Sequence, residues 1–492
     1  MGYLELIDRY KDDMIKTLQE LVAFKSVVSA PVMRMSGENK DEKELLPFGK
    51  GVQDAFEYML AKAAADGFET ENVDNYGGHI EFGGYTLDEE GLIITTSDEV
   101  MGIVGHLDVV PEGSDWKYDP FSGTVEGDKI FGRGTIDDKG PVVAAYYAMK
   151  AIKDAGIMPA KKVRLVLGLD EETEWKGMKK YLARVKAPDF GFTPDAEFPA
   201  IQAEKGIMVF QLARKLSKTV NKGLELRSLS GGNAPNMVAD FARAVVRSEQ
   251  TENYEEIRRA AAEFREETGY KVLVKGTGKS LEITTTGVSA HGARPHTGLN
   301  AISIMMAFLQ KLTFVNDDVN DFVEFYNKHI GFELDGESLG VHFCDNESGD
   351  LILNVGKVAL EKEAITLTIN VRYPVTCTDE QVYEAMLPVV NKYNMGIVKE
   401  KTQEPIFIPS DSPMLKTLMD VYREHTGDTE REPLVIGGGT YARAVKNVIA
   451  FGPSFPGERE VAHQKNEYAE IPKLITAAKI YADAIYRLTL PE

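Results

Sequence analysis

Four acidic residues follow directly on an apolar run in the segment LVLGLDEETEWKG, residues 165–177. The run over 163–169 predicts a buried strand, and the acids after it are Asp170, Glu171, Glu172 and Glu174. One interpretation is the start of a helix, where unpaired N–H groups carry partial positive charge and favour acids. The other is a metal site with a general base beside it. Taken alone, the segment favours the helix start.

A histidine and an aspartate stand one residue apart in GHLDVVP, residues 105–111. His106 and Asp108 point to the same side of an extended strand, because side chains alternate between its two faces. The imidazole of His106 could bind a metal ion, and Asp108 could accept its other ring N–H and fix the tautomer. The alternative is a local hydrogen bond at the end of a strand, and the two residues do not decide between these readings.

Further acids and one histidine stand in loop-like segments. Asp137 and Asp138 precede an apolar helix in GRGTIDDKGP, where an aspartate could cap the helix or bridge two metal ions about 3.5–4 Å apart. Asp195 in GFTPDAEFP and His463 in VAHQKNEY are ordinary residues for loops when each is taken alone.

Together these motifs make a coordination set without cysteine: His106, Asp137, Glu172, Asp195 and His463. Two imidazoles and three carboxylates suit a pair of Zn²⁺, Mn²⁺ or Co²⁺ ions. If Asp137 bridges, one ion takes His106, Asp137 and Asp195. The other ion takes Asp137, Glu172 and His463, and each keeps the open position typical of catalytic sites.

The elements that must position these residues alternate between strands and helices. Strands are predicted at 101–110 and 161–170, and helices at 141–155 and 173–185. This alternation predicts an α/β domain with a mixed, largely parallel sheet and helices on both faces. Ligands of such sheets bind beyond the carboxyl ends of strands, where His106, Asp137 and Glu171 fall. Helices are also predicted at 4–24 and 51–66, with a loop over 29–50.

The pattern changes after about residue 206. Strands are predicted at 207–216, 270–276, 280–288, 351–361, 364–374 and 395–401, and helices at 236–247, 253–268, 298–313 and 379–392. Helices at 413–425 and 471–487, around a strand at 445–453, return to the first pattern. We therefore predict a discontinuous metal-binding catalytic domain, 1–205 and 405–492. Residues 206–404 form an inserted α+β lid domain, whose two similar halves could be related modules.

Composition narrows the classes of partner. The chain has 492 residues, more than one core usually supports, and its net charge is −21. That acidity argues against nucleic acid and anionic membrane as partners. No apolar run approaches the roughly 18 residues of a transmembrane helix, and the charged N-terminus is unlike a signal peptide. The only cysteines, Cys344 and Cys377, form no disulfide framework, so we expect a reducing cytoplasm.

The motifs in their order resemble a known family. GHLDVVP, DPFSG, GRGTIDDKGP, LDEETEWKG, TPDAEFP, SAHGARPHTGLNA and GGGTYAR resemble the dinuclear-zinc metallopeptidase family of aminoacylases, carboxypeptidases and dipeptidases. TPDAEFP, GGGTYAR, HQKNEY and the long insert are most similar to peptidase V-type (carnosinase-like) dipeptidases. The resemblance implies the five metal ligands above, with Zn²⁺ first and Mn²⁺ or Co²⁺ as alternatives. It also implies a cis peptide between Asp137 and Asp138.

The resemblance further assigns three catalytic roles. Asp108 corresponds to the carboxylate that orients His106, Glu171 to the general base, and His291 to a lid histidine that stabilises the oxyanion. The reaction expected is hydrolysis of a small peptide, a dipeptide with a free C-terminal carboxylate. Alternatives are an N-acyl-amino-acid deacylase of the same family and a catalytically silent metal-binding scaffold. We expect a monomer, because the doubled lid would fill the space that a dimer partner takes in shorter relatives.

Substrate-binding residues are predicted from their chemistry. Arg372 in INVRYP suits a free carboxylate, because guanidinium pairs with it bidentately, although an exposed arginine at a strand end is an equal alternative. Asn236 could add a polar contact. Gly437, Gly438 and Gly439 in GGGTYAR could bring backbone N–H groups close to substrate, or could form only a tight turn.

Overall fold

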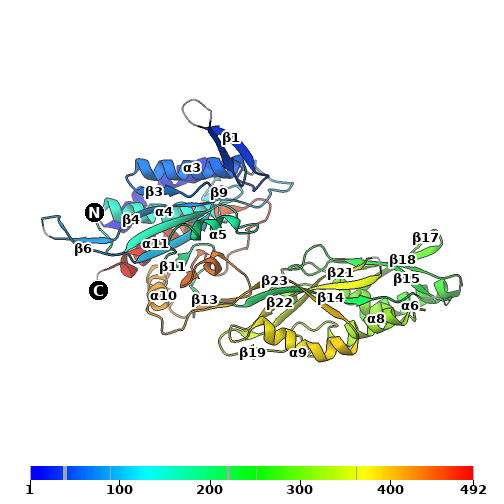
Figure 1. Ribbon diagram of the computed structural model, residues 1–492. Helices are drawn as coiled ribbons and strands as arrows, with labels where there is room; N and C mark the ends of the chain where they lie inside the picture. The colour runs from blue at the N-terminus through cyan, green and yellow to red at the C-terminus, as the bar shows by residue number, and fades with distance from the viewer. Residues whose placement is uncertain are drawn as a thin grey trace. The chain divides into compact units, whose positions relative to one another are not determined.

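The computed structural model describes residues 2–36, 42–88, 90–218, 222–250, 252–361 and 363–490. The chain folds into two compact units (Figure 1). The first unit comprises Met1–Gln202, Ile408–Leu434 and Gly439–Glu492, and the second comprises Ala203–Phe407 and Val435–Gly438. The predicted lid, 206–404, lies within the second unit, which also takes in residues 435–438 and with them Gly437 and Gly438.

A six-stranded sheet forms the centre of the first unit. Its order is β26-β11-β7-β10-β4-β3, with bounds Val448–Ala450, Phe190–Thr193, Val100–His106, Lys162–Gly168, Gly78–Gly83 and Glu69–Asn72. The four strands from β26 to β10 run parallel, and β4 and β3 are antiparallel to their neighbours. The predicted mixed, largely parallel sheet is confirmed.

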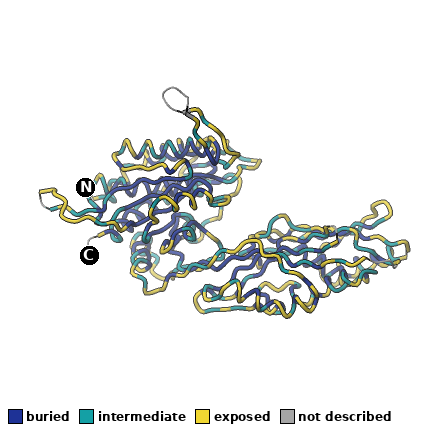
Figure 2. The backbone as a smooth tube through the Cα atoms, viewed as in Figure 1, coloured by how far each residue is buried: buried dark blue, intermediate teal, exposed yellow. Residues whose placement is uncertain are grey.

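Helices cover this sheet and bury its apolar strands. They are α1 Tyr3–Arg9, α2 Lys11–Val22, α3 Lys50–Ala65, α4 Lys139–Asp154, α5 Lys176–Leu182, α10 Pro413–Thr426 and α11 Ile471–Leu488. Every residue of β7 is buried, and so is most of α4, which packs on α11 (Figure 2). The parallel register sets Gly168 of β10 beside His106 of β7. The segments that leave these two strands therefore start side by side.

The second unit is built on an antiparallel sheet. Its order is β17-β18-β16-β15-β21-β22-β14-β23, with bounds Lys271–Thr277, Ser280–Thr286, Phe241–Arg247, Glu225–Gly231, Ile352–Glu361, Ala364–Tyr373, Gly206–Lys215 and Gly396–Gln403. Its helices are α6 Glu252–Thr268, α7 Ala301–Leu309, α8 Asp317–His329 and α9 Asp379–Lys392. A separate apolar core lies within this unit, so the predicted α+β class is confirmed.

Short strands complete the described elements. They are β1 Val32–Ser36, β2 Glu42–Leu46, β5 Tyr85–Leu87, β6 Ile93–Thr96, β8 Thr124–Glu126, β9 Lys129–Phe131, β12 Ala196–Glu197, β13 Ile201–Glu204, β19 Cys344–Asp345, β20 Gly349–Asp350, β24 Ile406–Phe407, β25 Leu434–Ile436, β27 Pro453–Ser454 and β28 Tyr468–Glu470. The 3₁₀ turns are η1 Pro295–Thr297 and η2 Tyr441–Ala444.

Three predicted elements differ from the structure. The helix predicted at 236–247 is strand β16, in which Ala242, Ala244 and Val246 are buried on one face. Its alanines favour a helix locally, but pairing with β15 and β18 overrides that preference. The loop predicted at 29–50 contains the β1–β2 hairpin, whose strands pair from Val32 with Leu46 onward. The single helix predicted at 4–24 is divided at Tyr10 into α1 and α2.

Candidate metal centre

His106 ends strand β7 and is completely buried. Its Nδ1 lies 2.9 Å from the carbonyl oxygen of Asp108. Because a carbonyl only accepts, Nδ1 carries a ring proton, and in the neutral imidazole Nε2 is left to offer a lone pair. Nε2 lies 3.1 Å from Oδ1 of Asp137 and 3.8 Å from Oδ2 of Asp195. The first predicted ligand group is therefore assembled around one imidazole.

The two oxygens of Asp137 face different histidines. While Oδ1 faces His106, Oδ2 lies 2.9 Å from Nε2 of His463, which is also 2.9 Å from Oε1 of Glu172. Asp137 thus stands between two groups, one with His106 and Asp195 and one with Glu172 and His463. The assignment of these residues to two ions that share Asp137 stays a prediction.

The segment around Asp137 does not behave as a simple helix cap. The peptide between Asp137 and Asp138 is cis, as the resemblance implied. Asp138 occupies the N-cap position of α4 without a side-chain capping bond, and its Oδ2 accepts the N–H of His106 at 3.1 Å instead. The capping alternative therefore fails for both aspartates, and Asp138 ties the start of α4 to the end of β7.

Asp108 contacts the acidic corner as well as His106. Its carboxylate lies 3.5 Å from Nδ1 of His106, farther than its own carbonyl oxygen. The same carboxylate accepts the N–H groups of Glu171 and Glu172, each at 3.1 Å. Asp108 therefore fixes the backbone that carries the two glutamates, and its carbonyl supplies the nearer contact to the imidazole.

The four acids of LDEETE divide between two tasks. Asp170 accepts the N–H of Gly177 at 3.0 Å, inside the first turn of α5, and so fulfils the helix-start reading. Glu174 is exposed and pairs with Lys176. Glu171 and Glu172 instead join the metal-ligand cluster. A ligand atom of Glu171 lies within 4.8 Å of those of His106 and Asp195, and one of Glu172 lies as close to those of His106 and Asp137.

The electrostatics of this cluster are dominated by burial of like charges. Burial raises the pKa of Glu171 to about 8, and neighbouring carboxylates add to the effect while His106 opposes it. Burial also raises the pKa of Asp195 well above its usual range. Burial would lower the pKa of His463, but Asp137 and Glu172 outweigh it and raise that pKa to about 11. The site therefore holds more buried carboxyl groups than its two histidines can pair with.

The donor set fits divalent metal ions. Within the described part of the first unit, no ion pair joins Asp137, Glu171, Glu172 or Asp195 to a lysine or arginine. Buried charges are paired or bind metal, because isolated ones are costly. Imidazole nitrogens and carboxylate oxygens are the ligands of Zn²⁺, Mn²⁺ and Co²⁺. The residues therefore fit divalent metal ions of this kind.

The predicted residues of the second unit lie close to one another. The peptide N–H of Gly292 donates to the carbonyl of Asn236 at 2.7 Å, and Met237 pairs with His291 in a β-bridge. A Cβ added to Gly437 would stand 3.0 Å from Ala293 and 3.6 Å from Cγ of Arg372. Gly438 belongs to this unit, whereas Gly439 belongs to the first.

Two of these side chains have defined local partners. Arg372, on β22, is 4 % exposed and donates from Nε to Oδ1 of Asn370 at 3.0 Å, so the alternative of an exposed arginine is wrong. Nδ1 of His291 lies 3.3 Å from the N–H of Ala293 and accepts it. An accepting Nδ1 leaves the ring proton on Nε2, which makes His291 a hydrogen-bond donor at that atom.

A buried ion pair supports the centre and was not among the predicted site residues. Arg133 and Glu467 are 2 % and 0 % exposed at their side chains, and Nη1 lies 2.6 Å from Oε2. Both stand in motifs quoted above, Arg133 in GRGTIDDKGP and Glu467 in HQKNEY. The signal available was two opposite charges in short segments that each carry a predicted ligand.

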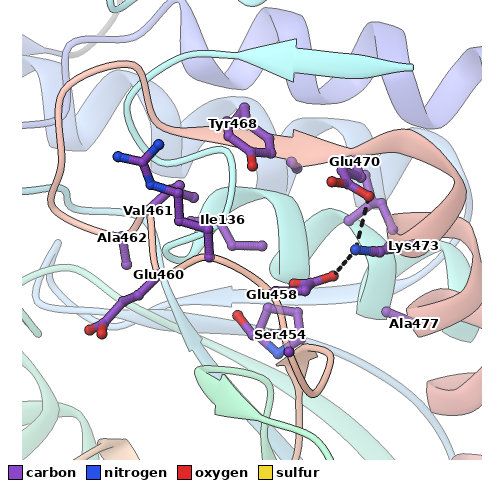
Figure 3. A pocket seen from close by; sticks show the side chains of 15 residues that line it. Ile136, Ser454, Glu458, Glu460, Val461, Ala462, Tyr468, Glu470, Lys473 and Ala477 are labelled. Carbon is purple, nitrogen blue, oxygen red and sulfur yellow. Dashed lines mark ion pairs between the residues drawn. The ribbon is translucent and has the colours of Figure 1, made fainter.

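A cavity of about 220 Å³ borders the same segments (Figure 3). Its lining includes Ile136 and Ala462, the residues before Asp137 and His463. Lys473 faces the cavity and is already paired with Glu458 at 2.5 Å and Glu470 at 2.9 Å. This lysine is therefore occupied locally and does not neutralise the metal ligands.

Comparisons with known proteins find a matching family model and similar sequences. Residues 102–487 match the model of peptidase family M20/M25/M40. A Bacillus subtilis protein named "Putative dipeptidase YtjP" is 36 % identical over 483 residues, 98 % of each chain. A Staphylococcus haemolyticus protein with the same kind of name is 35 % identical over 489 residues, again 98 % of each chain.

Solved structures show the same fold. Human carnosine dipeptidase 1 aligns with a TM-score of 0.53 and 16 % identity, covering 99 % of this chain and 98 % of that one. Aminoacylhistidine dipeptidase from Vibrio alginolyticus aligns with a TM-score of 0.54 and 14 % identity, covering 97 % of this chain and 96 % of that one.

Among the described residues, no helix is both long and apolar enough to cross a membrane.

Proposed function

This chain belongs to peptidase family M20/M25/M40, and from that premise we propose that it hydrolyses dipeptides with a free C-terminal carboxylate. The observation that carries the proposal is the pair of ligand groups around Asp137 with Glu171 beside them. The relatives at 35–36 % identity are named as dipeptidases, which supports the dipeptide over other peptides.

The five ligands His106, Asp137, Glu172, Asp195 and His463 would hold two divalent ions, for which we propose Zn²⁺. When bound, such ions polarise a scissile carbonyl and lower the pKa of water towards about 7. The remaining work falls to side chains of the chain itself. Asp108 and Asp138 hold the backbone of the two strand ends in place.

Glu171 is proposed as the general base. It accepts the proton of the attacking water and later delivers it to the leaving amine. Its burial supports this role, because a pKa of about 8 in the absence of ions shows a carboxylate that readily holds a proton. Bound cations favour the ionised form, which is the form that a base needs before the attack.

The second unit is proposed to supply substrate contacts. Arg372 would pair with the free carboxylate. The hydrogen bond from its Nε to Asn370 would keep the buried guanidinium in one orientation. His291 would donate from Nε2 to the developing oxyanion. Further polar contacts would come from Asn236 and from the backbone of Gly437, Gly438 and Gly439. The short distance between Gly437 and Arg372 supports this role for the glycines.

One experiment separates this proposal from deacylation of N-acyl amino acids. Metal-free protein is reloaded with Zn²⁺ or Mn²⁺ and assayed on matched dipeptides, tripeptides and N-acetyl amino acids. We expect dipeptides to be cleaved with the highest kcat/KM and the protein to be inactive before reloading. Preference for N-acetyl amino acids would establish the deacylase, and absence of turnover on every substrate would leave a silent scaffold.

We further propose that the protein acts as a monomer in the cytoplasm. Both of its cysteines, Cys344 and Cys377, are free thiols, as a reducing compartment favours. Light scattering of the purified chain tests the monomer, for which we expect a mass near 54.4 kDa.

A further inference from the structure

The pair Arg133–Glu467 lies inside the first unit and has no assigned role in catalysis. Both side chains are almost completely removed from solvent, and the pair is short at 2.6 Å. A buried pair of this kind is weak evidence for stability, because desolvation offsets most of the attraction. The role of the pair follows from the backbone segments to which its atoms are hydrogen-bonded.

Glu467 holds the backbone that leads to Asp137. Its Oε1 faces three backbone donors of the loop, the N–H groups of Gly134 at 2.9 Å, Ile136 at 3.1 Å and Asp137 at 3.4 Å. Its own carbonyl accepts the N–H of Gly132 at 3.0 Å. The loop therefore curls around one carboxylate, as backbone N–H groups do around an anion.

Arg133 ties two further segments to the same carboxylate. Its Nη1 donates to the carbonyl of Gln464 at 3.2 Å, and Nη2 to that of Pro111 at 3.4 Å. Gln464 follows His463 directly, and Pro111 ends the motif that contains His106 and Asp108. Three segments that carry predicted ligands or their supports are thereby joined at a single ion pair.

We propose that Glu467, together with Arg133, is a positioning residue that determines the position of Asp137 relative to His463. It thereby controls the affinity of the ion held by Asp137, Glu172 and His463. The other ion would share Asp137 but takes its remaining ligands, His106 and Asp195, from the end of β7 and the residues just after β11, so we expect it to depend less on the pair. This inference rests on the proposed metal centre.

The experiment compares two buried arginine–glutamate pairs of the same unit. Glu467→Gln removes the charge that the loop surrounds and keeps the size of the side chain. Glu81→Gln is the matched control, because Glu81 pairs with Arg164 at 2.6 Å, each side chain 8 % exposed, on strands β4 and β10. Metal-free proteins are titrated with Zn²⁺ against a chelating dye, without substrate, and their melting temperatures are recorded.

We expect Glu467→Gln to bind one ion with nearly native affinity and the other about tenfold more weakly, the lower range for residues that support metal ligands. Glu81→Gln should bind both ions within twofold of wild type, even though its melting temperature falls. Two native affinities in Glu467→Gln, or an equal loss in Glu81→Gln, would overturn the proposal.

A second variant covers a failure of Glu467→Gln to fold. Arg133→Lys keeps the charge and loses the forked contacts to Gln464 and Pro111, so it should weaken the same ion by a smaller factor. Native binding of both ions by Arg133→Lys would then overturn the proposal. Because no substrate is present, a protein that binds two ions but cleaves no dipeptide contradicts the proposed function and leaves this inference standing.

Discussion

Carboxylates at the amino and carboxyl ends of the central parallel strands have different neighbours. Near the start of β10, Glu81 lies 2.6 Å from Arg164 and 3.3 Å from Lys162. Beside the start of β7, Asp189 accepts the N–H of Val100 at 2.8 Å and pairs with Lys186 at 2.9 Å. At the carboxyl ends of the same strands, the acids have only histidines within ion-pair distance among the described residues.

The difference shows what distinguishes a metal site from a structural ion pair. A lysine or arginine beside an acid neutralises it permanently and leaves nothing for chemistry. Burial raises the pKa of an acid without such a partner, as at Glu171, and neighbouring acids raise it further, so the cluster favours an external cation. The absence of a basic side chain is therefore as informative as the presence of the ligands.

The largest expected effect separates the base from the ligands. Glu171→Gln should lower kcat by about 10³-fold, because proton transfer to a positioned side chain contributes about 10²–10⁴-fold. The variant should still bind two ions, since Glu171 lies beside the five predicted ligands and is not one of them. Activity and metal content of the same preparation check both halves. The matched control is Glu174→Gln, an exposed neighbour paired with Lys176, which should retain wild-type kcat.

The second effect is a change in the free energy of unfolding that has opposite signs at the two ends of the strands. In metal-free protein at pH 7, Glu81→Gln should lower the free energy of unfolding by about 3 kcal/mol, because it leaves Arg164 buried without its partner. Glu171→Gln should raise it by roughly 1 kcal/mol, because the raised pKa means that ionisation destabilises the fold.

The pH dependence of this gain follows from the sign of the shift. The pKa of Glu171 is near 4.5 in the unfolded chain and about 8 in the folded one. The folded state of the wild-type protein therefore loses stability as the pH rises from 4.5 towards 8. The gain in Glu171→Gln should therefore grow between pH 5 and pH 8. Urea unfolding at both pH values measures it, and a shift of the same sign in Glu81→Gln and Glu171→Gln would contradict the comparison.

The sequence predicted the parts of this site that depend on local spacing. His106 and Asp108 share a strand end, and Glu171 and Glu172 are adjacent, so their proximity needs little more than one sheet. The roles within LDEETE could not be assigned so simply. Asp170 serves α5 while its neighbours serve the centre, and the bonds from Asp108 decide which is which.

Long-range pairing explains what the sequence could not show. Strand β16 was predicted as a helix because its residues favour one locally, and only its neighbours β15 and β18 make it a strand. Glu467 was overlooked for a similar reason. Its partners lie more than 300 residues away in the chain, and nothing in HQKNEY alone shows that its carboxylate is enclosed by another loop.

A third effect contrasts two histidines of one sheet. Burial, with help from Arg164 and Lys162, lowers the pKa of His79 to about 4, while carboxylates hold the pKa of His106 well above its usual value. Because unfolded His79 titrates near 6.5, the unfolded chain binds more protons between those values, and stability falls as pH falls. From pH 7 to pH 5 this residue should cost about 2 kcal/mol.

His79→Gln tests that contribution, since glutamine can still accept from the hydroxyl of Tyr181, now 3.0 Å from Nδ1 of His79. Urea unfolding of the metal-free proteins at pH 7 and pH 5 should show a smaller loss in the variant than in wild type. An equal loss in both proteins would mean that the basic end of the sheet does not keep His79 neutral.

The smallest effect compares two aspartates that accept backbone N–H groups at opposite ends of β7. Asp108 holds Glu171 and Glu172, and Asp189 holds Val100. Asp108→Asn replaces one accepting oxygen by an amide that cannot accept, so one of the two glutamates loses its anchor. We expect kcat to fall about tenfold with both ions retained, as for other residues that support metal ligands. Asp189→Asn can keep its bond to Val100 and should leave kcat unchanged, so an equal fall in both variants would show that Asp108 acts only through the stability of the sheet.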